Sequence, residues 1–158
     1  MAKKEKIKKT LVEQILDKAK IGYESILFNT LESGKLPTGI GYDEVYKTLA
    51  LIGDKTGPLI GILPLTHHLS EKKLAKISGN KKVNMVPQKD LQKMTGYAHG
   101  ANNPVGIWQT KKFPIYIDKV ALESDFMYVS AGELGRSMRI NPSELAEFVQ
   151  ANFYDLSE

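Results

Sequence analysis

The sequence predicts a single α+β domain with a mixed, mostly antiparallel β-sheet and surrounding helices. The 158 residues, of which 42% are hydrophobic, are enough to bury one core, and no shift in composition divides them. Apolar residues recur at helical spacing in some segments and form short runs of strand-forming residues in others. Turn residues separate several of these runs by a few positions, which is typical of β-hairpins. We therefore expect residues 10–158 to form one domain and residues 1–9 to form a basic, flexible tail.

The first half of the chain alternates between helical and strand patterns. Leu11, Ile15 and Leu16 share one helical face, and Ser70 and Gly79 suit the two ends of a second helix. In chain order, we expect a helix over residues 10–20, a strand over 23–28, a loop over 30–41, hairpin strands over 45–52 and 59–63, a helix over 70–78 and a strand over 83–86.

Caps and glycines mark the second half of the chain. Pro87 and Gly96 suit the two ends of a short helix, whereas Asn141 and Pro142 suit the N-cap and first position of the last helix. In chain order, we expect a short helix over residues 87–96, a glycine-rich loop over 95–106, strands over 113–117, 126–130 and 138–140, and a final helix from residue 142.

The loop over residues 95–106 combines three glycines and a proline with almost no reactive side chains. Glycine allows a ligand to approach the main chain closely. The N–H groups near Gly96, Gly100 and Gly106 could therefore point at a carbonyl or phosphate oxygen. The alternative is a tight turn at the surface. The loop is thus a candidate site that works through backbone amides.

Lys47 and Ser130 are polar residues next to apolar strand patterns. Strand alternation turns Lys47 to the face opposite Tyr46 and Thr48. Lys47 lies either on the solvent face of an edge strand or in a cleft, where it meets an anion or an ester. Ser130 ends an expected strand, where its hydroxyl either meets a ligand or belongs to a plain turn.

Composition and motifs exclude several classes of protein. The absence of cysteine rules out disulfides, thiolate metal sites and a cysteine nucleophile. No Gly-x-Ser-x-Gly elbow, Walker loop or dinucleotide fingerprint is present. His67 and His68 would face opposite ways in a strand, and no carboxylate stands at ligand spacing, so we expect no metal. His99, within the glycine-rich loop, is either a general base or a surface residue.

Charge and hydropathy bear on partners and location. The formal net charge of +4 suits a polyanionic partner such as a nucleic acid, although proteins that bind none also reach this value. No run of about 18 apolar residues occurs, and no apolar stretch follows the N-terminal lysines. We therefore expect a soluble protein of the cytoplasm that does not contact a membrane.

Five segments form an ordered set along the chain. They are Val45–Leu49, Thr95–Tyr97, Gly100–Gly106, Phe113–Asp118 and Tyr128–Gly132. Each is weak alone, but together they resemble the YbaK/EbsC family of free-standing prolyl-tRNA editing-domain proteins, over residues 10–155. The resemblance implies a mixed sheet with surrounding helices. It also implies a trans-editing activity that cleaves the ester of Cys-tRNA(Pro), which forms when prolyl-tRNA synthetase mistakes cysteine for proline.

The resemblance also implies a site without metal or cofactor. Lys47 takes the place of the family's essential lysine, and Gly100 that of the glycine whose backbone amide meets the substrate, so both are expected to be catalytic. The expected substrate-binding residues are Phe28, Thr48, Ala101, Pro104, Ser130, Gly132 and Ser137. Phe28 stands where members of the family carry a tyrosine, and Ser137 stands where some of them carry an aspartate. The implied partners are the acceptor end of tRNA(Pro) and prolyl-tRNA synthetase.

The mechanism that the resemblance implies uses the substrate as its own nucleophile. The cysteine thiol attacks the ester carbonyl and gives a cyclic thioester and free tRNA, so the protein needs only to orient the ester and stabilise the oxyanion. Prolyl-tRNA carries no thiol, so this reaction cannot cleave it. Two alternatives stay open: a deacylase for another small aminoacyl group, such as Ala-tRNA(Pro), and a module that binds tRNA or a synthetase without turnover.

Overall fold

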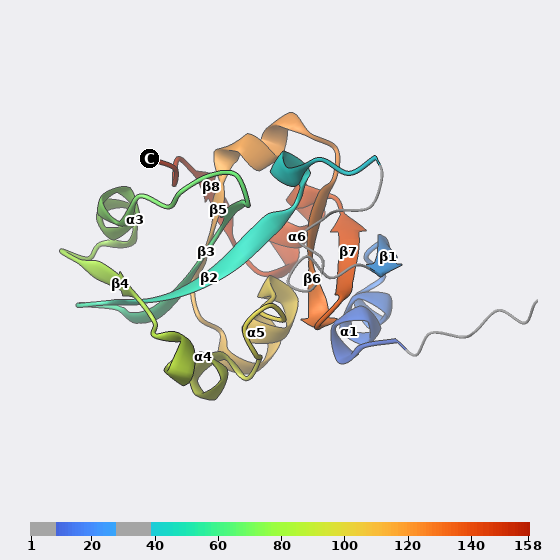
Figure 1. Cartoon of the computed structure of the whole chain (residues 1–158), viewed down its shortest axis with the longest axis horizontal. Helices are drawn as coiled ribbons and strands as arrows, with labels where there is room; N and C mark the ends of the chain where they lie inside the picture. Colours follow the sequence, from blue (N-terminus) through green and yellow to red (C-terminus); the bar gives the residue numbers. More distant parts are fainter. Residues whose placement is uncertain (1–8, 28–38) are drawn as a thin grey trace, which may run out of the picture.

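The computed structural model describes residues 9–27 and 39–158, as helices and strands that alternate along the chain (Figure 1). In chain order the described elements are α1 (Leu11–Ala19), β1 (Tyr23–Leu27), the 3-10 helix η1 (Tyr42–Glu44), β2 (Tyr46–Gly53), β3 (Gly57–Pro64), α3 (Glu71–Ser78), β4 (Val83–Met85), α4 (Gln88–Thr95), α5 (Pro104–Lys111), β5 (Ile115–Asp118), the 3-10 helix η2 (Lys119–Glu123), β6 (Met127–Glu133), β7 (Arg136–Ile140), α6 (Pro142–Phe148) and β8 (Asn152–Tyr154). Residues 1–8 of the expected tail and residues 30–38 of the expected loop over 30–41 lie outside the described residues.

The described strands form two sheets rather than one. An antiparallel sheet has the order β1-β7-β6, and a mixed sheet has the order β4-β2-β3-β5-β8. In the mixed sheet, β5 runs parallel to β3 and β8 parallel to β5, whereas β2 is antiparallel to both of its neighbours. A parallel bridge joins Val45, the residue before β2, to Tyr128 of β6. The mixed, mostly antiparallel character is confirmed, but the strands diverge into two layers beyond this bridge.

Helix ends lie where the cap signals in the sequence place them. Thr10 and Glu13 form a complete capping box at the start of α1, and the Asn141 side chain caps α6. Ser70 accepts a hydrogen bond from the backbone of Lys73 at the start of α3. Gly96 ends α4 in the left-handed conformation, at φ 87°. These helix ends are therefore set by hydrogen bonds between residues that are close in sequence.

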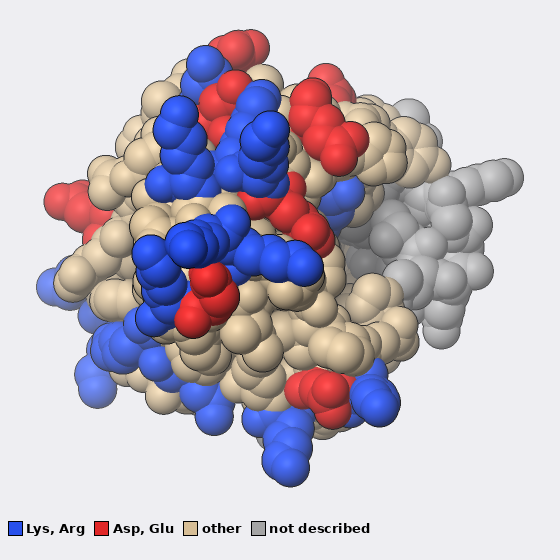
Figure 2. Space-filling view, turned by 90° about the vertical axis from the view of Figure 1, so that its left-hand side faces the viewer, with Lys and Arg blue, Asp and Glu red and all other residues tan. Residues whose placement is uncertain are grey.

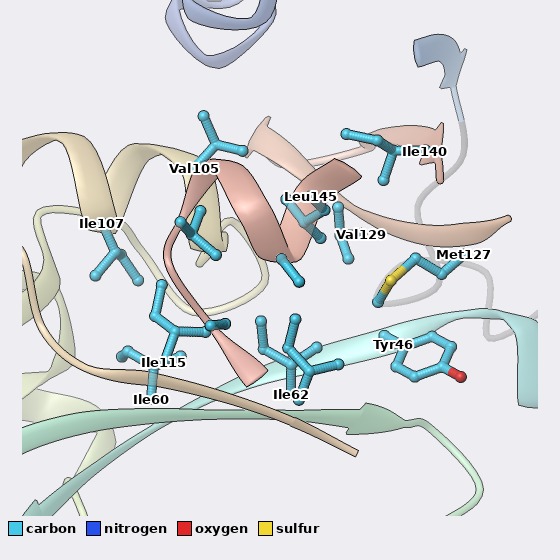
Figure 3. Close-up of a cluster of buried hydrophobic side chains, with 14 of the residues drawn as sticks. Tyr46, Ile60, Ile62, Val105, Ile107, Ile115, Met127, Val129, Ile140 and Leu145 are labelled. Carbon is cyan, nitrogen blue, oxygen red and sulfur yellow. The ribbon is translucent and has the colours of Figure 1, made fainter. Parts of the chain in front are cut away.

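The two faces of β2 and β3 bury two separate clusters of side chains, as strand alternation requires. Tyr46, Ile60 and Ile62 belong to the larger cluster, which lies between the two sheets and includes residues of α1, α5 and α6 (Figure 3). Leu51 and Leu59, on the opposite faces of the same strands, pack against α3. Alternation places Lys47 on the face of Leu51, opposite Tyr46, as predicted.

Besides the two 3-10 helices, one α-helix and one strand of the described structure were missed from the sequence. Residues 104–111 form α5, although they were assigned partly to the glycine-rich loop, and residues 152–154 form β8. Asn103 caps α5 through a bond from the Gly106 N–H, and Pro104 occupies its first turn. Helix α5 thus begins with the same Asn-Pro pair as α6. The pair was not recognised as a helix start because Gly106 follows it closely. No helix in the described part of the chain is long and apolar enough to cross a membrane.

Candidate active site

A cavity of about 480 Å³ opens between the two sheets, beside the first half of β2. Its walls come from four parts of the chain: β2, the segment from β4 into α4, the loop between α4 and α5, and the facing strands β6 and β7. Lys47 and Gly100, which are 53 positions apart in the sequence, both line it. The two residues expected to be catalytic therefore share one cavity.

The edge of β2 leaves its backbone uncovered at the cavity. The β2–β4 ladder ends where the Val86 N–H donates to the Ala50 carbonyl at 3.0 Å, because α4 begins at Gln88 instead of continuing the strand. Backbone groups point to alternate sides along a strand, so the N–H and C=O of Thr48 point the same way as those of Ala50. The Thr48 hydroxyl is also buried, with no hydrogen-bond partner in the described structure. Thr48 thus offers polar groups to a ligand.

Lys47 is held by a backbone carbonyl. Its Nζ donates to the carbonyl oxygen of His67, at 2.6 Å, in the turn that follows β3. Partial burial lowers the pKa of Lys47 below its ordinary value, because desolvation disfavours the ammonium. Burial and the nearby charge of Asp118 raise the pKa of Tyr46 to about 12, so its phenol stays protonated. Lys47 and Tyr46 both line the cavity, from opposite faces of β2.

A buried network fixes the loop that carries Gly100. The Thr95 hydroxyl lies 2.7 Å from Asn102 Oδ1 and accepts the Tyr97 N–H at 3.1 Å. Asn103 Nδ2 donates to the Ala101 carbonyl at 3.0 Å. Gly100 itself has φ 93°, a conformation that favours glycine, and it is exposed to the cavity. The main chain at Gly100 is therefore accessible and held in place.

The expectation that three glycines would present amides is wrong for two of them. The Gly96 N–H donates to the Gln92 carbonyl at 2.8 Å, and the Gly106 N–H donates to Asn103 Oδ1 at 2.6 Å. A Cβ at Gly106 would overlap the Tyr97 hydroxyl, so this glycine is needed for packing. Both amides therefore serve helix ends, Gly96 at the end of α4 and Gly106 at the start of α5.

Strands β6 and β7 supply the opposite wall. Ser130 and Ser137 face each other in register, and both line the cavity. The Ser130 hydroxyl accepts the Gly132 N–H at 3.1 Å. Arg136 also lines the cavity, but its guanidinium is bound by the buried carboxylate of Glu13, at 2.6 and 3.1 Å. This wall is therefore polar and its one cation is already engaged by an anion.

Five of the expected site residues line the cavity: Lys47, Thr48, Gly100, Ser130 and Ser137. Three others do not line it: Ala101 is buried in the protein, Pro104 opens α5, and Gly132 packs so closely on Val12 that a Cβ would crowd that side chain. Phe28 lies outside the described residues.

Sequence reasoning missed the apolar wall of the cavity. Met85, Val86 and Leu91, from β4 and α4, line it together with His99 and Asn102. His99 was identified as a candidate, and it is exposed at the cavity. In the sequence, these apolar residues have the same pattern as core residues, so nothing distinguished a residue that lines the cavity from one that is buried in the core. Among residues 9–27 and 39–158, no group of three or more His, Asp or Glu residues could hold a metal.

The fold thus gathers a lysine, an exposed strand edge and a glycine loop around one cavity. The family model described as aminoacyl-tRNA editing domain matches residues 37–148, and the chain belongs to this family. It is 34% identical, over 99% of its length and 98% of the relative's, to the "Putative Cys-tRNA(Pro)/Cys-tRNA(Cys) deacylase EbsC" of Enterococcus faecalis.

Solved structures share this fold. The structure described as "a putative trans-editing enzyme for prolyl tRNA synthetase" has a TM-score of 0.80 and 22% identity, covering 93% of this chain and 94% of that one. The structure of "hypothetical protein APE2540" has a TM-score of 0.82 and 21% identity, covering 93% and 99% of the two chains. At this identity the likeness establishes the fold alone.

Proposed function

We propose that this protein is a trans-editing deacylase that removes cysteine from mischarged Cys-tRNA(Pro). The observation that carries the proposal is the shared cavity of Lys47 and Gly100, the two residues that the family resemblance marks as catalytic. The family membership and the name of the 34% identical relative support the substrate class. The cavity volume of about 480 Å³ suits a small aminoacyl group together with part of a terminal nucleotide.

In the proposed reaction the substrate supplies its own nucleophile. The thiol sulfur bonds to the ester carbonyl carbon, the bond from that carbon to the ribose oxygen breaks, and the thiol proton passes to the ribose oxygen. The products are a cyclic thioester and tRNA with a free hydroxyl. An attacking group already attached to the carbonyl gains the advantage of an intramolecular reaction. The chain has no cysteine of its own, and this route needs none.

The residues around the cavity have defined parts in this proposal. The N–H groups of Thr48 and Gly100 hold the carbonyl oxygen as negative charge develops on it. The Lys47 ammonium stabilises the charge on the leaving ribose oxygen. The hydroxyls of Ser130 and Ser137 bind the α-amino group, at a wall that carries no free carboxylate. Proline would fit the same space, but it has no thiol and cannot react.

A second candidate is hydrolysis of another small aminoacyl-tRNA, such as Ala-tRNA(Pro). The exposed His99 in the cavity wall favours it, because an imidazole can activate the water that this route requires. Products separate the two reactions: self-cleavage yields a cyclic thioester from the cysteine substrate and leaves the alanine substrate intact. Turnover of both substrates to free amino acids would support the water route.

A polyanionic substrate suits the charge of one face. Residues 71–93, which form α3, β4 and the start of α4, carry seven lysines and two acidic residues. Figure 2 shows basic side chains gathered over the side of the molecule where these elements lie. Because β4 and α4 also form a wall of the cavity, tRNA phosphates bound here would bring the acceptor end to the site.

The decisive experiment is a deacylation assay with a panel of mischarged tRNAs. We expect Cys-tRNA(Pro) to be cleaved and the Lys47→Ala variant to lose about 100-fold or more of the rate, as when a charge-stabilising group is removed from an active site. The matched control is Lys18→Ala, an exposed lysine on α1, which should behave as the unsubstituted protein. Binding of tRNA without cleavage of any member of the panel would instead identify a non-catalytic binding module.

A further inference from the structure

We propose that Asp118, Ser157 and His67 form a hydrogen-bonded relay that positions Lys47, so that the C-terminal segment supports the active site. The proposal rests on the proposed function, because it assigns a role to residues that hold its central lysine. None of the three relay residues lines the cavity, and none belongs to the site residues expected from the sequence. Each would act through Lys47 and is therefore a positioning residue.

The contacts run in one unbroken line from a buried carboxylate to the ammonium. Asp118 is 3% exposed, and its Oδ2 accepts the Ser157 hydroxyl at 2.6 Å. The Ser157 Oγ lies 2.7 Å from Nδ1 of His67. The His67 carbonyl oxygen then accepts the Lys47 Nζ at 2.6 Å. Three segments that are distant in sequence, at the end of β3, the end of β5 and the C-terminus, therefore meet at Lys47.

Donor counting fixes the direction of the hydrogen bonds. The Asp118 carboxylate accepts from the Val120 and Leu156 backbone N–H groups as well as from Ser157, so it acts only as an acceptor. A serine hydroxyl has one proton, and that proton points at Asp118. The Ser157 oxygen must therefore accept from Nδ1–H of His67, which assigns the proton of the imidazole to Nδ1.

The relay holds one peptide plane from two sides. The His67 ring is fixed through Ser157, and the next carbonyl, of His68, accepts the Glu158 N–H at 2.9 Å. These two bonds lie on either side of the His67 carbonyl, which points at Lys47. If the hydroxyl of Ser157 were removed, the ring would be released and the carbonyl could turn away from the ammonium.

The C-terminal segment does not depend on the relay for its own position. The Leu156 carbonyl accepts the Ser70 N–H at 2.7 Å, and the Leu156 side chain is fully buried in the cluster under α3. Lys73 also donates to the Ser157 carbonyl at 2.6 Å. The segment should therefore stay docked when a single hydroxyl is removed, which makes the catalytic role testable apart from folding.

The test compares variants that keep or remove one hydrogen bond of the relay. In Ser157→Ala we expect kcat for Cys-tRNA(Pro) to fall about 10- to 100-fold, as for a small misplacement of a catalytic group, with KM unchanged. Ser157→Thr keeps the hydroxyl and should retain kcat. His67→Asn places an amide N–H near the position of Nδ1–H and should retain most of kcat, whereas His67→Leu should lose it. Ser143→Ala, at an exposed serine of α6, is the control.

Two results would overturn the relay. One is an unchanged kcat in Ser157→Ala. The other is an equal loss in Ser157→Ala and Ser157→Thr, or a loss seen mainly in KM, since either would mark a structural role. Failure of the proposed function would give a different result, because the unsubstituted protein would then not cleave the substrate at all. In that case the relay is tested by the NMR resonance of the Lys47 side chain, which is assigned by its disappearance in Lys47→Met. If the relay exists, this resonance shifts in Ser157→Ala and does not shift in Ser143→Ala.

Discussion

At the scale of single residues, Gly106 shows how packing can dictate a residue that looks functional. Its N–H donates to the side chain of Asn103, which caps α5, and the Tyr97 hydroxyl fills the space that a Cβ would need. We predict that Gly106→Ala lowers the free energy of unfolding by about 1–3 kcal/mol, the usual cost of overpacking. Denaturant unfolding measures this change.

The control for Gly106→Ala is Gly22→Ala. Nothing lies within 4 Å of a Cβ at Gly22, so this change should stay within about 0.5 kcal/mol. Equal effects of the two substitutions would show that the Tyr97 hydroxyl does not constrain Gly106.

The charge of Lys47 predicts a pH dependence of the reaction. Desolvation lowers the pKa of Lys47, and the proposed role needs the ammonium. Activity should therefore be present below the lowered pKa and be lost as pH rises through it, at a pH below that of an ordinary lysine. The measurement is kcat against pH, after subtraction of the uncatalysed ester hydrolysis.

The variant Lys47→Arg tests whether Lys47 causes the loss of activity at high pH. Arginine stays protonated throughout this range, so the residual activity of the variant should show no basic limb. A rate that instead rises with pH in the unsubstituted protein would mean that Lys47 acts as a neutral base.

At the scale of elements, the sequence was informative where a boundary depends on local chemistry. The caps of α3 and α6 and the Gly96 end of α4 were predicted, because each is made by residues within four positions of one another, whereas α1 was predicted from its apolar spacing and not from its capping box. Helix α5 has an equally good start at Asn103, but it is buried along much of its length and shows no amphipathic pattern. Strand β8 has three residues and owes its pairing to β5, which no local pattern reports.

The buried pair of Glu13 and Arg136 fixes α1 against β7. Glu13 is fully buried, Arg136 is 8% exposed, and Ser25 of β1 also donates to the carboxylate. Removing one partner leaves a buried charge uncompensated, so we predict that Arg136→Met lowers the free energy of unfolding by about 3–5 kcal/mol. Chemical denaturation measures the decrease.

Arg139 gives a control on the same strand. Its ion pair with Glu24 is exposed and 4.0 Å long, so Arg139→Met should cost about 1 kcal/mol or less. If the two arginine variants are destabilised by the same amount, burial does not set the strength of the Glu13 pair.

At the scale of the whole molecule, the cavity follows from the divergence of the two sheets. They touch through the bridge between Val45 and Tyr128, and the space beyond it is closed by α4 and the loop after it. The family resemblance led to Lys47, Thr48, Gly100, Ser130 and Ser137, which the fold gathers from three regions. It could not indicate the apolar wall from β4 and α4, because a residue that lines a cavity and one that fills a core obey the same hydropathy pattern.

Charge is also distributed unevenly over the whole molecule, and this predicts how substrate affinity responds to salt. Residues 71–93 have a formal charge of +5, while the other described residues, with ten basic and fourteen acidic side chains, sum to −4. If tRNA phosphates bind the basic face, the triple variant Lys81→Glu, Lys82→Glu and Lys89→Glu should raise KM strongly and leave kcat unchanged. The plot of log kcat/KM against log salt should also become less steep, by about 0.7–0.9 for each phosphate that the variant no longer neutralises.

A second triple variant carries the same change in charge at other exposed positions: Lys18→Glu, Lys111→Glu and Lys119→Glu. These lysines lie on α1, α5 and η2, outside residues 71–93, so their replacement lowers the net charge equally without touching the proposed phosphate-binding lysines. General electrostatic attraction would weaken both triple variants alike, whereas a defined binding face weakens only the first. Equal effects in the two variants would therefore show that the net charge of the molecule, and not this face, attracts tRNA.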